Sequence, residues 1–441
     1  MTLRVGIVGA GPAGIMAALK AAAQGAVVHL YDTNQAVGRK LTVAGNGRCN
    51  LTNADLRPEV YTSDAPMALA AVLARYGYLA LLADLEALGI PTYATPDGWT
   101  YPVSNSGAAV IELLTVALEQ AGVQVRLMTK VTGLRLLGGP PPPPPPPPKA
   151  TRTSPGGGEA VVGAGPCHGF ALELGHSPQR DVHDCVIIAA GGMASEALGS
   201  RGDCLPMLAQ LGHTVLPVRP ALSPLTADMR PVHALQGVRL DVALRLYADG
   251  ALLGESLGNL MFTQGGLSGP APMDLAHLVS ANQGGALEAR IDLVPAHAAQ
   301  LEEALALGQA RNTPAAVALM GFMPPKLAPV LLRLAGLPDD VRLGNLDPAA
   351  LARLRQQAHG LMVRVTGTRP LSQSQLSTGG VPLTEVDPAT MESRVVPGLY
   401  LAGELLNVIG PCGGFNLHWA WASGAVAGRA AGAESGPAAG V

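Results

Sequence analysis

The 441-residue sequence has few charged and few aromatic residues, which argues against several classes of protein. Charged residues make up 14% of the chain, aromatic residues 3%, and the net charge is −3. Because Lys and Arg are not in excess, we expect no cationic surface and no nucleic-acid partner. No run reaches about 18 uninterrupted apolar residues, so we expect no membrane span.

Cysteine is scarce, and the five cysteines have no spacing typical of a structural site. They include no C-x-x-C pair and no companion histidine at ligand spacing, so we expect neither a disulfide framework nor a metal. The apolar run 5–19 imitates a secretory signal, but Gly and Pro interrupt it and cleavage would remove a strand of the fold. We therefore expect a cytoplasmic protein. The cysteines are Cys49, Cys167, Cys185, Cys204 and Cys412.

Small residues are abundant, and the first strand runs into a glycine motif. The segment RVGIVGAGPAG, residues 4–14, reads as a buried strand, a tight turn and a helix start. Gly9, Gly11 and Gly14 fit G-x-G-x-x-G, in which the second glycine lets the backbone approach a pyrophosphate. A second apolar strand, 26–32, ends in Asp32, close to the ~20-residue spacing expected for an acid that binds a ribose hydroxyl. This pattern predicts a dinucleotide site.

The polar segment GRKLTVAGNGRCNLTN, residues 38–53, predicts a binding loop rather than a helix or strand. Its glycines allow the main chain to approach a planar ligand, its cations can neutralise phosphates, and its asparagines can bind a polar ring. A solvated basic loop is the alternative. These residues are Arg39, Lys40, Gly45, Asn46, Gly47, Arg48, Asn50 and Asn53.

A second glycine-rich segment lies near the C-terminus. Residues 399–404, LYLAGE, read as a strand that ends in an acid, and residues 410–428 read as a glycine turn that leads into a helix. The free N–H groups of Gly413 to Asn416, at the positive end of the helix dipole, can stabilise negative charge on a bound cofactor. An ordinary buried helix capped by glycines is the alternative. His418 and Trp419 are expected to pack inside this helix.

The loop 38–53 resembles the signature G-R-K-L-x-x-[ST]-G-x-G-R-C-N-x-[ST]-N of the BaiN-like NAD(P)/FAD-dependent oxidoreductases. This family includes bile-acid-reductase-like and aminoacetone-oxidase-like flavoproteins. Residues 184–192 and 262–270 resemble two further family motifs. Trp99 stands where the family has Arg in G-R-x-[YF]-P. The resemblance implies an α/β fold: a glutathione-reductase-like, FAD-binding Rossmann domain interrupted by an inserted domain that is part β-barrel-like and part helical.

The resemblance also implies FAD as the cofactor, with Glu404 accepting a ribityl hydroxyl and the backbone near Val131 meeting the adenine. The residues expected to bind the cofactor are Gly9, Ala10, Gly11, Ala13, Gly14, Asp32, Arg39, Lys40, Asn46, Gly47, Arg48, Cys49, Asn50, Val131, Gly191, Gly403, Glu404, Gly413, Gly414, Phe415 and Asn416. No catalytic residue and no metal ligand is identified.

We predict three segments: 1–203 as the first part of the FAD domain, 204–360 as the insert and 361–441 as the second part. Residues 138–166 contain nine consecutive prolines, 140–148, and predict an external insertion, most simply an inert spacer. A ligand for a proline-binding module is the alternative.

The leading hypothesis is that NAD(P)H reduces a small organic substrate through FAD. Because only one nucleotide fingerprint is present, the nicotinamide would visit the flavin transiently. An amine oxidase that uses oxygen and a non-enzymatic, partner-binding flavoprotein are the alternatives. A flavin-coupled dithiol of Cys49 and Cys412 is less favoured, because the two lack the close spacing of disulfide oxidoreductases. The oligomeric state stays open.

Overall fold

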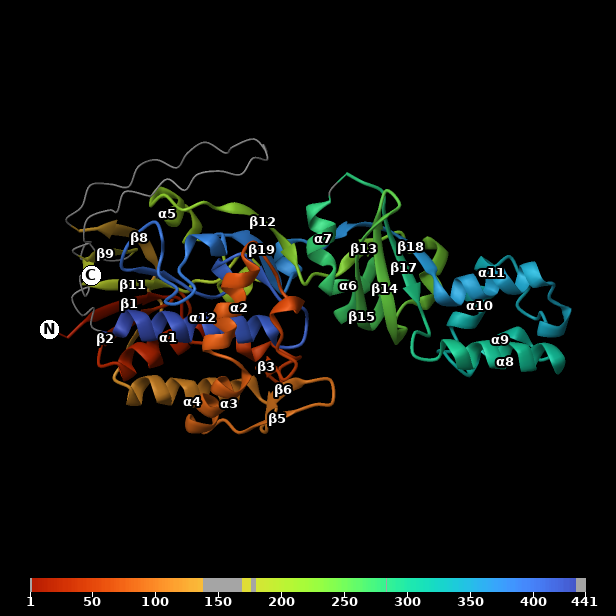
Figure 1. Ribbon diagram of the computed structural model, residues 1–441, viewed down its shortest axis with the longest axis horizontal. Helices are drawn as coiled ribbons and strands as arrows, with labels where there is room; N and C mark the ends of the chain where they lie inside the picture. The colour runs from red at the N-terminus through yellow and green to blue at the C-terminus, as the bar shows by residue number, and fades with distance from the viewer. Residues whose placement is uncertain (1, 138–168, 176–179, 283, 434–441) are drawn as a thin grey trace. The chain divides into compact units, whose positions relative to one another are not determined.

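The chain forms two compact units in the computed structural model (Figure 1), which describes residues 2–137, 169–175, 180–282 and 284–433. Unit 1 consists of Met1–Val218 and Ser377–Val441, and unit 2 of Arg219–Leu376. The proline run falls outside the described residues.

A five-stranded parallel sheet forms the centre of unit 1, in the order β20-β11-β1-β2-β7. The two N-terminal strands and the helix between them lie where the sequence predicts them. The Rossmann fold class is therefore confirmed. The elements are β1 (Arg4–Val8), α1 (Pro12–Ala23), β2 (Val27–Tyr31), β7 (Gln124–Arg126), β11 (Cys185–Ile188) and β20 (Leu399–Leu401).

Smaller sheets and helices complete unit 1. Three-stranded antiparallel sheets are formed by β8-β9-β10 and by β3-β6-β5, and two pairs are formed by β12-β19 and β21-β4. The strands are β3 (Thr52–Asn53), β4 (Thr62–Ser63), β5 (Thr92–Ala94), β6 (Trp99–Pro102), β8 (Val131–Leu136), β9 (Phe170–Leu174), β10 (Arg180–His183), β12 (Leu216–Ala221), β19 (Leu376–Gly380) and β21 (Val408–Ile409). The helices are α2 (Pro66–Arg75), α3 (Tyr78–Ala87), α4 (Gly107–Gln120), α5 (Leu205–Gln210) and α12 (Phe415–Gly432).

The stretch Pro66–Ala87 is long and apolar enough to cross a membrane by length and composition alone, with a mean hydropathy of 1.5. It is not one continuous helix. The chain breaks at Tyr76 and Gly77, which separates α2 from α3, and each helix has ten residues. A helix of ten residues is only about half as long as a membrane span requires.

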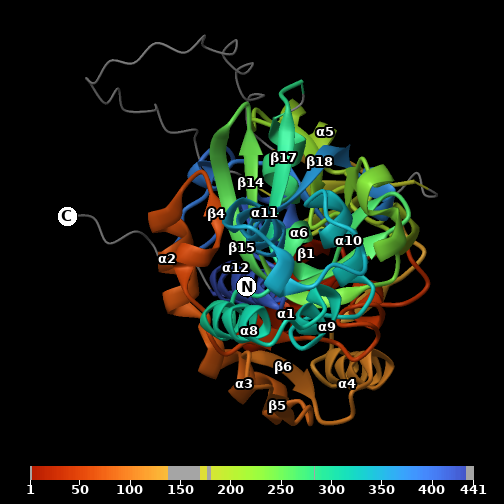
Figure 2. The same ribbon diagram turned by 90° about the vertical axis from the view of Figure 1, so that its right-hand side faces the viewer.

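Unit 2 contains a closed six-stranded barrel in the order β13-β16-β15-β14-β17-β18. Its α-helices lie between the barrel strands in sequence: α6 and α7 come between β16 and β17, and α8 to α11 come between β17 and β18. Figure 2 labels β14, β15, β17 and β18 of the barrel. This agrees with the predicted barrel-like and helical insert. The elements are β13 (Leu225–Ala227), β14 (Arg239–Ala248), β15 (Ala251–Thr263), β16 (Gly266–Ser268), α6 (Pro270–Asp274), α7 (Ala276–Ala281), β17 (Leu287–Asp292), α8 (Ala298–Ala310), α9 (Ala315–Met320), α10 (Leu327–Leu334), α11 (Pro348–His359) and β18 (Leu361–Thr368).

The unit boundaries differ from the expected 203/204 and 360/361. Strand β18, expected to re-enter the first domain, pairs with β13 and β17 and closes the barrel. Helix α5, expected in the insert, packs Leu205 and Leu208 into the core of unit 1. A buried strand has the same alternating pattern whichever sheet it joins, so the pattern alone does not place it.

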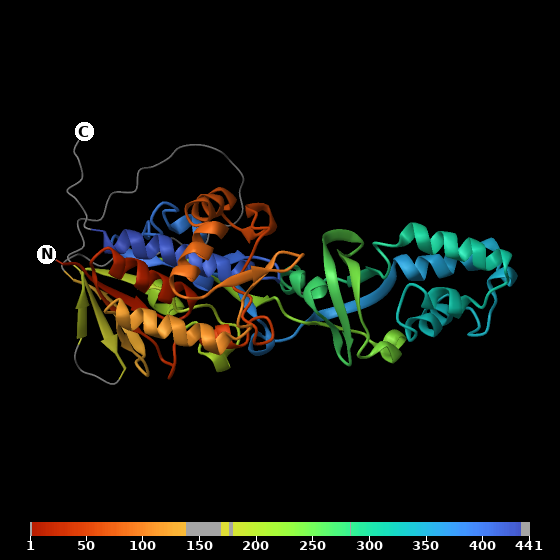
Figure 3. The ribbon, with the colours of Figure 1, turned by 90° about the horizontal axis from the view of Figure 1, so that it is seen from below.

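Helices α1 and α12 lie side by side at very short range, as the red and blue helices of Figure 3 show. Gly424, Gly428 and Gly432 face Ala13, Ala17 and Ala21. A methyl group added to Gly424 or Gly428 would overlap with the backbone of α1, and one added to Gly432 would lie 2.8 Å from Cα of Ala21. Each of these positions in α12 therefore requires glycine.

We expect Gly428→Ala to destabilise unit 1 by about 1–3 kcal/mol or more, because overpacking usually costs this much. The new methyl group would overlap with the backbone of α1. Denaturant unfolding measures this change. The control is Gly321→Ala, at φ −69°, where the new methyl makes only ordinary contact with the Ala318 carbonyl at 3.5 Å. Equal stability of the two variants would contradict the close packing.

Candidate functional site

The three fingerprint glycines have three different surroundings. Gly9 has φ +104°, and a Cβ there would overlap with the Ala189 carbonyl. A Cβ on Gly14 would overlap with the Gly9 carbonyl, so Gly14 lets the helix close onto the turn. At Gly11, by contrast, no described atom lies within 4 Å of an added Cβ. Gly11 is thus the position at which the turn presents bare backbone to open space, as a pyrophosphate site requires.

Asp32 is fixed at the end of β2 and in turn fixes the glycine turn. Its Oδ2 accepts a hydrogen bond from the Ala10 N–H at 2.7 Å. Its Oδ1 accepts hydrogen bonds from the backbone N–H and from the side-chain amide of Asn34. Asn34 accepts a hydrogen bond from Arg39 at 2.6 Å. The acid, the turn and a cation of the 38–53 loop therefore form one connected network, with the carboxylate where the sequence predicts a ribose ligand.

Glu404 and Lys40 form a half-buried ion pair, with 2.5 Å between Nζ and Oε2. The other Glu404 oxygen accepts the backbone N–H and the hydroxyl of Ser377, both at 3.0 Å. Lys40 was expected to neutralise a phosphate, but its charge is used on this carboxylate. Ser377 has no role in the sequence prediction. The only feature of the sequence that could have drawn attention to Ser377 is the glycine pair that follows it in QLSTGG.

Cys49 lies in the 38–53 loop, fully buried and at φ +63°. Burial raises the pKa of its thiol to about 12, so the thiol stays protonated at neutral pH. A protonated thiol is a poor nucleophile, which argues against the dithiol hypothesis. The left-handed backbone of Cys49 turns the chain between the exposed Arg48 and the buried Asn50.

The asparagines of the loop differ in their bonding. Asn53 donates to the Gly413 carbonyl at 3.0 Å and accepts the N–H of Asp55. Asn46 is exposed, at φ +57°. Asn50 is 5% exposed, and its Oδ1 has no hydrogen-bond partner among the described residues. An orphaned buried acceptor beside the glycine-rich turns fits a cofactor that carries ring N–H groups.

Gly414 is the N-cap of helix α12, at φ +98°, and the first-turn N–H groups of the helix have no acceptor within it. Asn416, expected to bind the cofactor, uses its side chain locally: Oδ1 accepts the Gly410 N–H at 2.7 Å and Nδ2 donates to the Gly410 carbonyl at 2.8 Å. This pairing closes the turn before the helix. The contribution of Asn416 to a ligand is thus limited to its backbone N–H.

Side chains of α12 hold both loops of the site. Trp419 donates to the Gly403 carbonyl at 3.1 Å, and Ser423 accepts the Gly403 N–H at 2.9 Å. Trp421 donates to the Leu51 carbonyl at 3.2 Å. Helix α12 therefore sets the positions of Glu404 and Asn50, each next to one of these anchors.

His418 is a packing residue, as expected. Its Nδ1 accepts the Thr52 hydroxyl at 2.8 Å, which leaves Nε2 to donate to the Tyr76 carbonyl at 3.1 Å. Val131 is buried at the start of β8, and Gly191 has φ +76°. Their contacts with adenine or nucleotide stay predictions, as do the roles of the other expected cofactor ligands.

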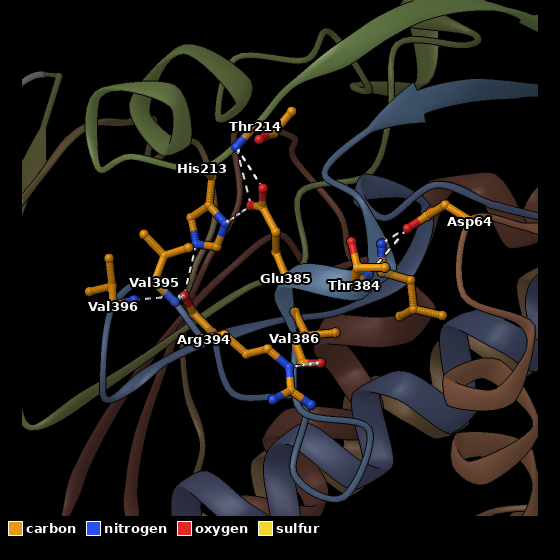
Figure 4. A network of polar contacts seen from close by, with 11 residues as sticks. Asp64, His213, Thr214, Thr384, Glu385, Val386, Arg394, Val395 and Val396 are labelled. Atoms are coloured by element: carbon orange, nitrogen blue, oxygen red, sulfur yellow. Dashed lines mark hydrogen bonds and ion pairs between the residues drawn. The ribbon is translucent and has the colours of Figure 1, made fainter. Parts of the chain in front are cut away.

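A second polar network in unit 1 has the order of a hydrolytic triad (Figure 4). Ser393 Oγ lies 2.9 Å from His213 Nε2, and His213 Nδ1 lies 2.7 Å from Glu385. However, Ser393 is 6% exposed and its Oγ accepts the N–H groups of Val395 and Val396. The hydroxyl is fixed in a turn without access for a substrate. We therefore interpret this network as structural.

Hydrogen bonds in this network favour the ionised form of Glu385. Burial acts to raise the pKa of Glu385, but hydrogen bonds from His213 and Thr214 outweigh burial and lower it. Asp64, in the same view, accepts the N–H groups of Leu383 and Thr384. Both carboxylates therefore hold the segment that leads toward β20 and Glu404.

A cluster of His29, Asp181 and His183 has ligand atoms within 4.8 Å of one another, the range of a metal site. The Tyr31 hydroxyl fills it, 2.7 Å from Asp181 and 3.0 Å from His183. Arg126 pairs with Asp181, which adds a cation where a metal would need an anion. We interpret the cluster as a hydrogen-bonded core network.

We expect Gly11→Ala to leave the free energy of unfolding of the apoprotein nearly unchanged and to weaken dinucleotide binding at least tenfold. The new methyl meets no protein atom, and φ −78° suits alanine, so only a ligand is obstructed. Thermal unfolding and FAD titration measure the two effects. Gly14→Ala is the comparison, because its methyl overlaps with protein and should destabilise the apoprotein itself.

We expect stability to fall as the pH drops from about 6.5 to 4. Burial lowers the pKa of His418 to about 4, although its bond to the Tyr76 carbonyl opposes the shift. Unfolding therefore takes up a proton in this window, and stability decreases by about 1.4 kcal/mol per pH unit for each such group. His418→Gln should reduce the slope, measured by denaturant unfolding, below pH 6.5 but not above it. An unchanged slope would contradict this role.

The chain is similar to known proteins along nearly its whole length. The model of the HI0933-like protein Rossmann domain matches residues 3–137 and 168–430. The 3-dehydro-bile acid delta(4,6)-reductase of Clostridium scindens is 33% identical over 435 residues, 97% of this chain and 98% of that protein. The ribosomal RNA dihydrouridine synthase of Escherichia coli is 28% identical over 95% of each chain.

Solved structures share the fold at low identity. The 3-ketosteroid delta1-dehydrogenase of Sterolibacterium denitrificans aligns over 98% of this chain and 99% of its own, with a TM-score of 0.50 and 12% identity. The family model and the bile-acid reductase confirm the family resemblance drawn from the 38–53 loop. The chain belongs to the HI0933-like family and is an FAD-dependent oxidoreductase.

Proposed function

We propose that this enzyme takes electrons from NAD(P)H and reduces a carbon–carbon double bond conjugated with a carbonyl group in a small organic substrate. The observation that carries the proposal is the nearly full-length likeness to two enzymes whose names describe one kind of reaction. A 3-dehydro-bile acid with delta(4,6) unsaturation is a conjugated ketone. Dihydrouridine is uridine whose ring double bond, next to a carbonyl, has been reduced.

The reaction adds a hydride to the carbon β to the carbonyl and a proton to the α carbon. FAD, when bound, supplies the hydride, so the chain itself needs to bind, orient and stabilise charge. The unpaired N–H groups at the start of α12 and the positive end of its dipole suit the negative charge of a reduced flavin.

A small molecule is the favoured substrate rather than RNA. The bile-acid reductase has the higher identity, and the net charge of −3 offers no general electrostatic attraction to a phosphate backbone. Because the sequence has a single nucleotide fingerprint, NAD(P)H would visit the flavin transiently rather than occupy a fold of its own.

The first test is anaerobic. NADPH and then NADH are added to the FAD-loaded protein while the flavin band is followed, and we expect bleaching by at least one of them. A 3-oxo-4-ene steroid or 2-cyclohexenone should then restore the yellow colour, whereas the saturated ketone cyclohexanone should not.

Two outcomes would contradict the proposal. A protein that stays yellow with both nucleotides but consumes oxygen with an amine would favour the amine oxidase alternative. Reoxidation by uridine in RNA, but by no small enone, would contradict the proposed substrate class.

A further inference from the structure

Asn50 carries a feature of unit 1 that the rest of the described structure does not explain. Its side chain is 5% exposed, and Oδ1 has no hydrogen-bond partner among the described residues. A buried carbonyl oxygen without a donor is destabilising, and native proteins leave few of them. Such an atom points to a ligand that supplies the missing N–H or O–H.

The backbone on both sides prevents Asn50 from moving to find a protein donor. The N–H of Cys49 donates to the Ala44 carbonyl, and the N–H of Leu51 donates to the Thr100 carbonyl, both at 2.8 Å. The Leu51 carbonyl in turn accepts the bond from Trp421 of α12. The position of Asn50 is therefore set by β6 and α12 together.

Asn50 lies between two glycines that have left-handed backbones. A Cβ on Gly45 would lie 3.2 Å from its Cβ, and one on Gly414 would lie 2.8 Å from Oδ1. Gly414 is the N-cap of the 18-residue helix α12, whose first-turn N–H groups are free of helical partners. A buried acceptor and a set of backbone donors thus lie next to each other.

This arrangement selects for a particular ligand chemistry. A phosphate only accepts hydrogen bonds from such donors, so it would leave the Asn50 oxygen unpaired. A ring edge on which N–H groups alternate with carbonyl oxygens satisfies both sides. Among the parts of FAD, the isoalloxazine ring has this edge.

We propose that Asn50 Oδ1 accepts a hydrogen bond from a ring N–H of the isoalloxazine, while the start of α12 serves the ring carbonyls. The ring has two candidate donors: N3–H, present in both redox states, and N5–H, present only after reduction. Asn50 thus recognises the ring, and in the second case it also favours the reduced form. The inference rests on FAD as the cofactor and is independent of NAD(P)H and of the enone substrate.

The test compares Asn50→Leu, which removes the acceptor at similar volume, with Asn50→Asp, which keeps an acceptor oxygen. Two quantities are measured: the affinity of the apoprotein for oxidised FAD by fluorescence titration, and the midpoint potential of the holoenzyme by equilibration with a reference dye under chemical reduction. The matched control is Asn105→Gly, since Asn105 is exposed, has φ +49° and lies outside the loop.

The two donors give different results with Asn50→Leu. If N3–H is the donor, affinity for oxidised FAD falls about tenfold and the midpoint potential stays constant. If N5–H is the donor, that affinity stays constant and the reduced form is bound tenfold less tightly, which lowers the potential by about 30 mV for two electrons.

Parent-like affinity together with a parent-like potential in Asn50→Leu would overturn the proposal. If circular dichroism shows that Asn50→Leu does not fold, the test rests on Asn50→Asp. We expect the affinity of this variant for oxidised FAD to stay within threefold of that of the parent. A tenfold loss in Asn50→Asp would mean that the amide nitrogen, not the oxygen, serves the ring. Because the reductant is chemical, failure of NAD(P)H to bleach the flavin leaves this result unaffected.

Discussion

The close approach of α1 and α12 is the constraint on which the rest of unit 1 depends. Gly424, Gly428 and Gly432 remove the side chains that would separate the two helices. Since α1 begins at the glycine turn of the dinucleotide site, its contact with α12 fixes the start of α12 relative to that turn. Residues from opposite ends of the chain are thereby held in one arrangement without a covalent link.

Helix α12 combines packing with polar anchoring. Apolar burial positions a helix but tolerates small rotations and slides, whereas hydrogen bonds from buried side chains specify its orientation. Trp419 and Ser423 both bind the backbone of Gly403, whereas Trp421 and His418 bind the neighbouring residues Leu51 and Thr52. The helix thus gives the site its geometry, and the cofactor supplies the redox chemistry.

Local motifs were predictable from the sequence, and distant partnerships were not. The glycine turn and Asp32 depend on contacts within about one supersecondary unit, so spacing alone identifies them. The Lys40–Glu404 pair joins residues 364 positions apart, and Ser377 joins it from a third segment. The boundary near 376 was misplaced because β18 has the same alternation in a barrel as in any half-buried sheet. The orphaned oxygen of Asn50 is visible only once its surroundings are known.

The discontinuity of unit 1 has a consequence for biosynthesis. Unit 2 is one uninterrupted segment, so a nascent chain can complete it as soon as it leaves the ribosome. The flavin site forms later, because Glu404 and α12 are synthesised after unit 2. At usual translation rates roughly 20–70 s separate the synthesis of Asn50 from that of Glu404. During that interval the face of α1 that packs against α12 has no partner helix.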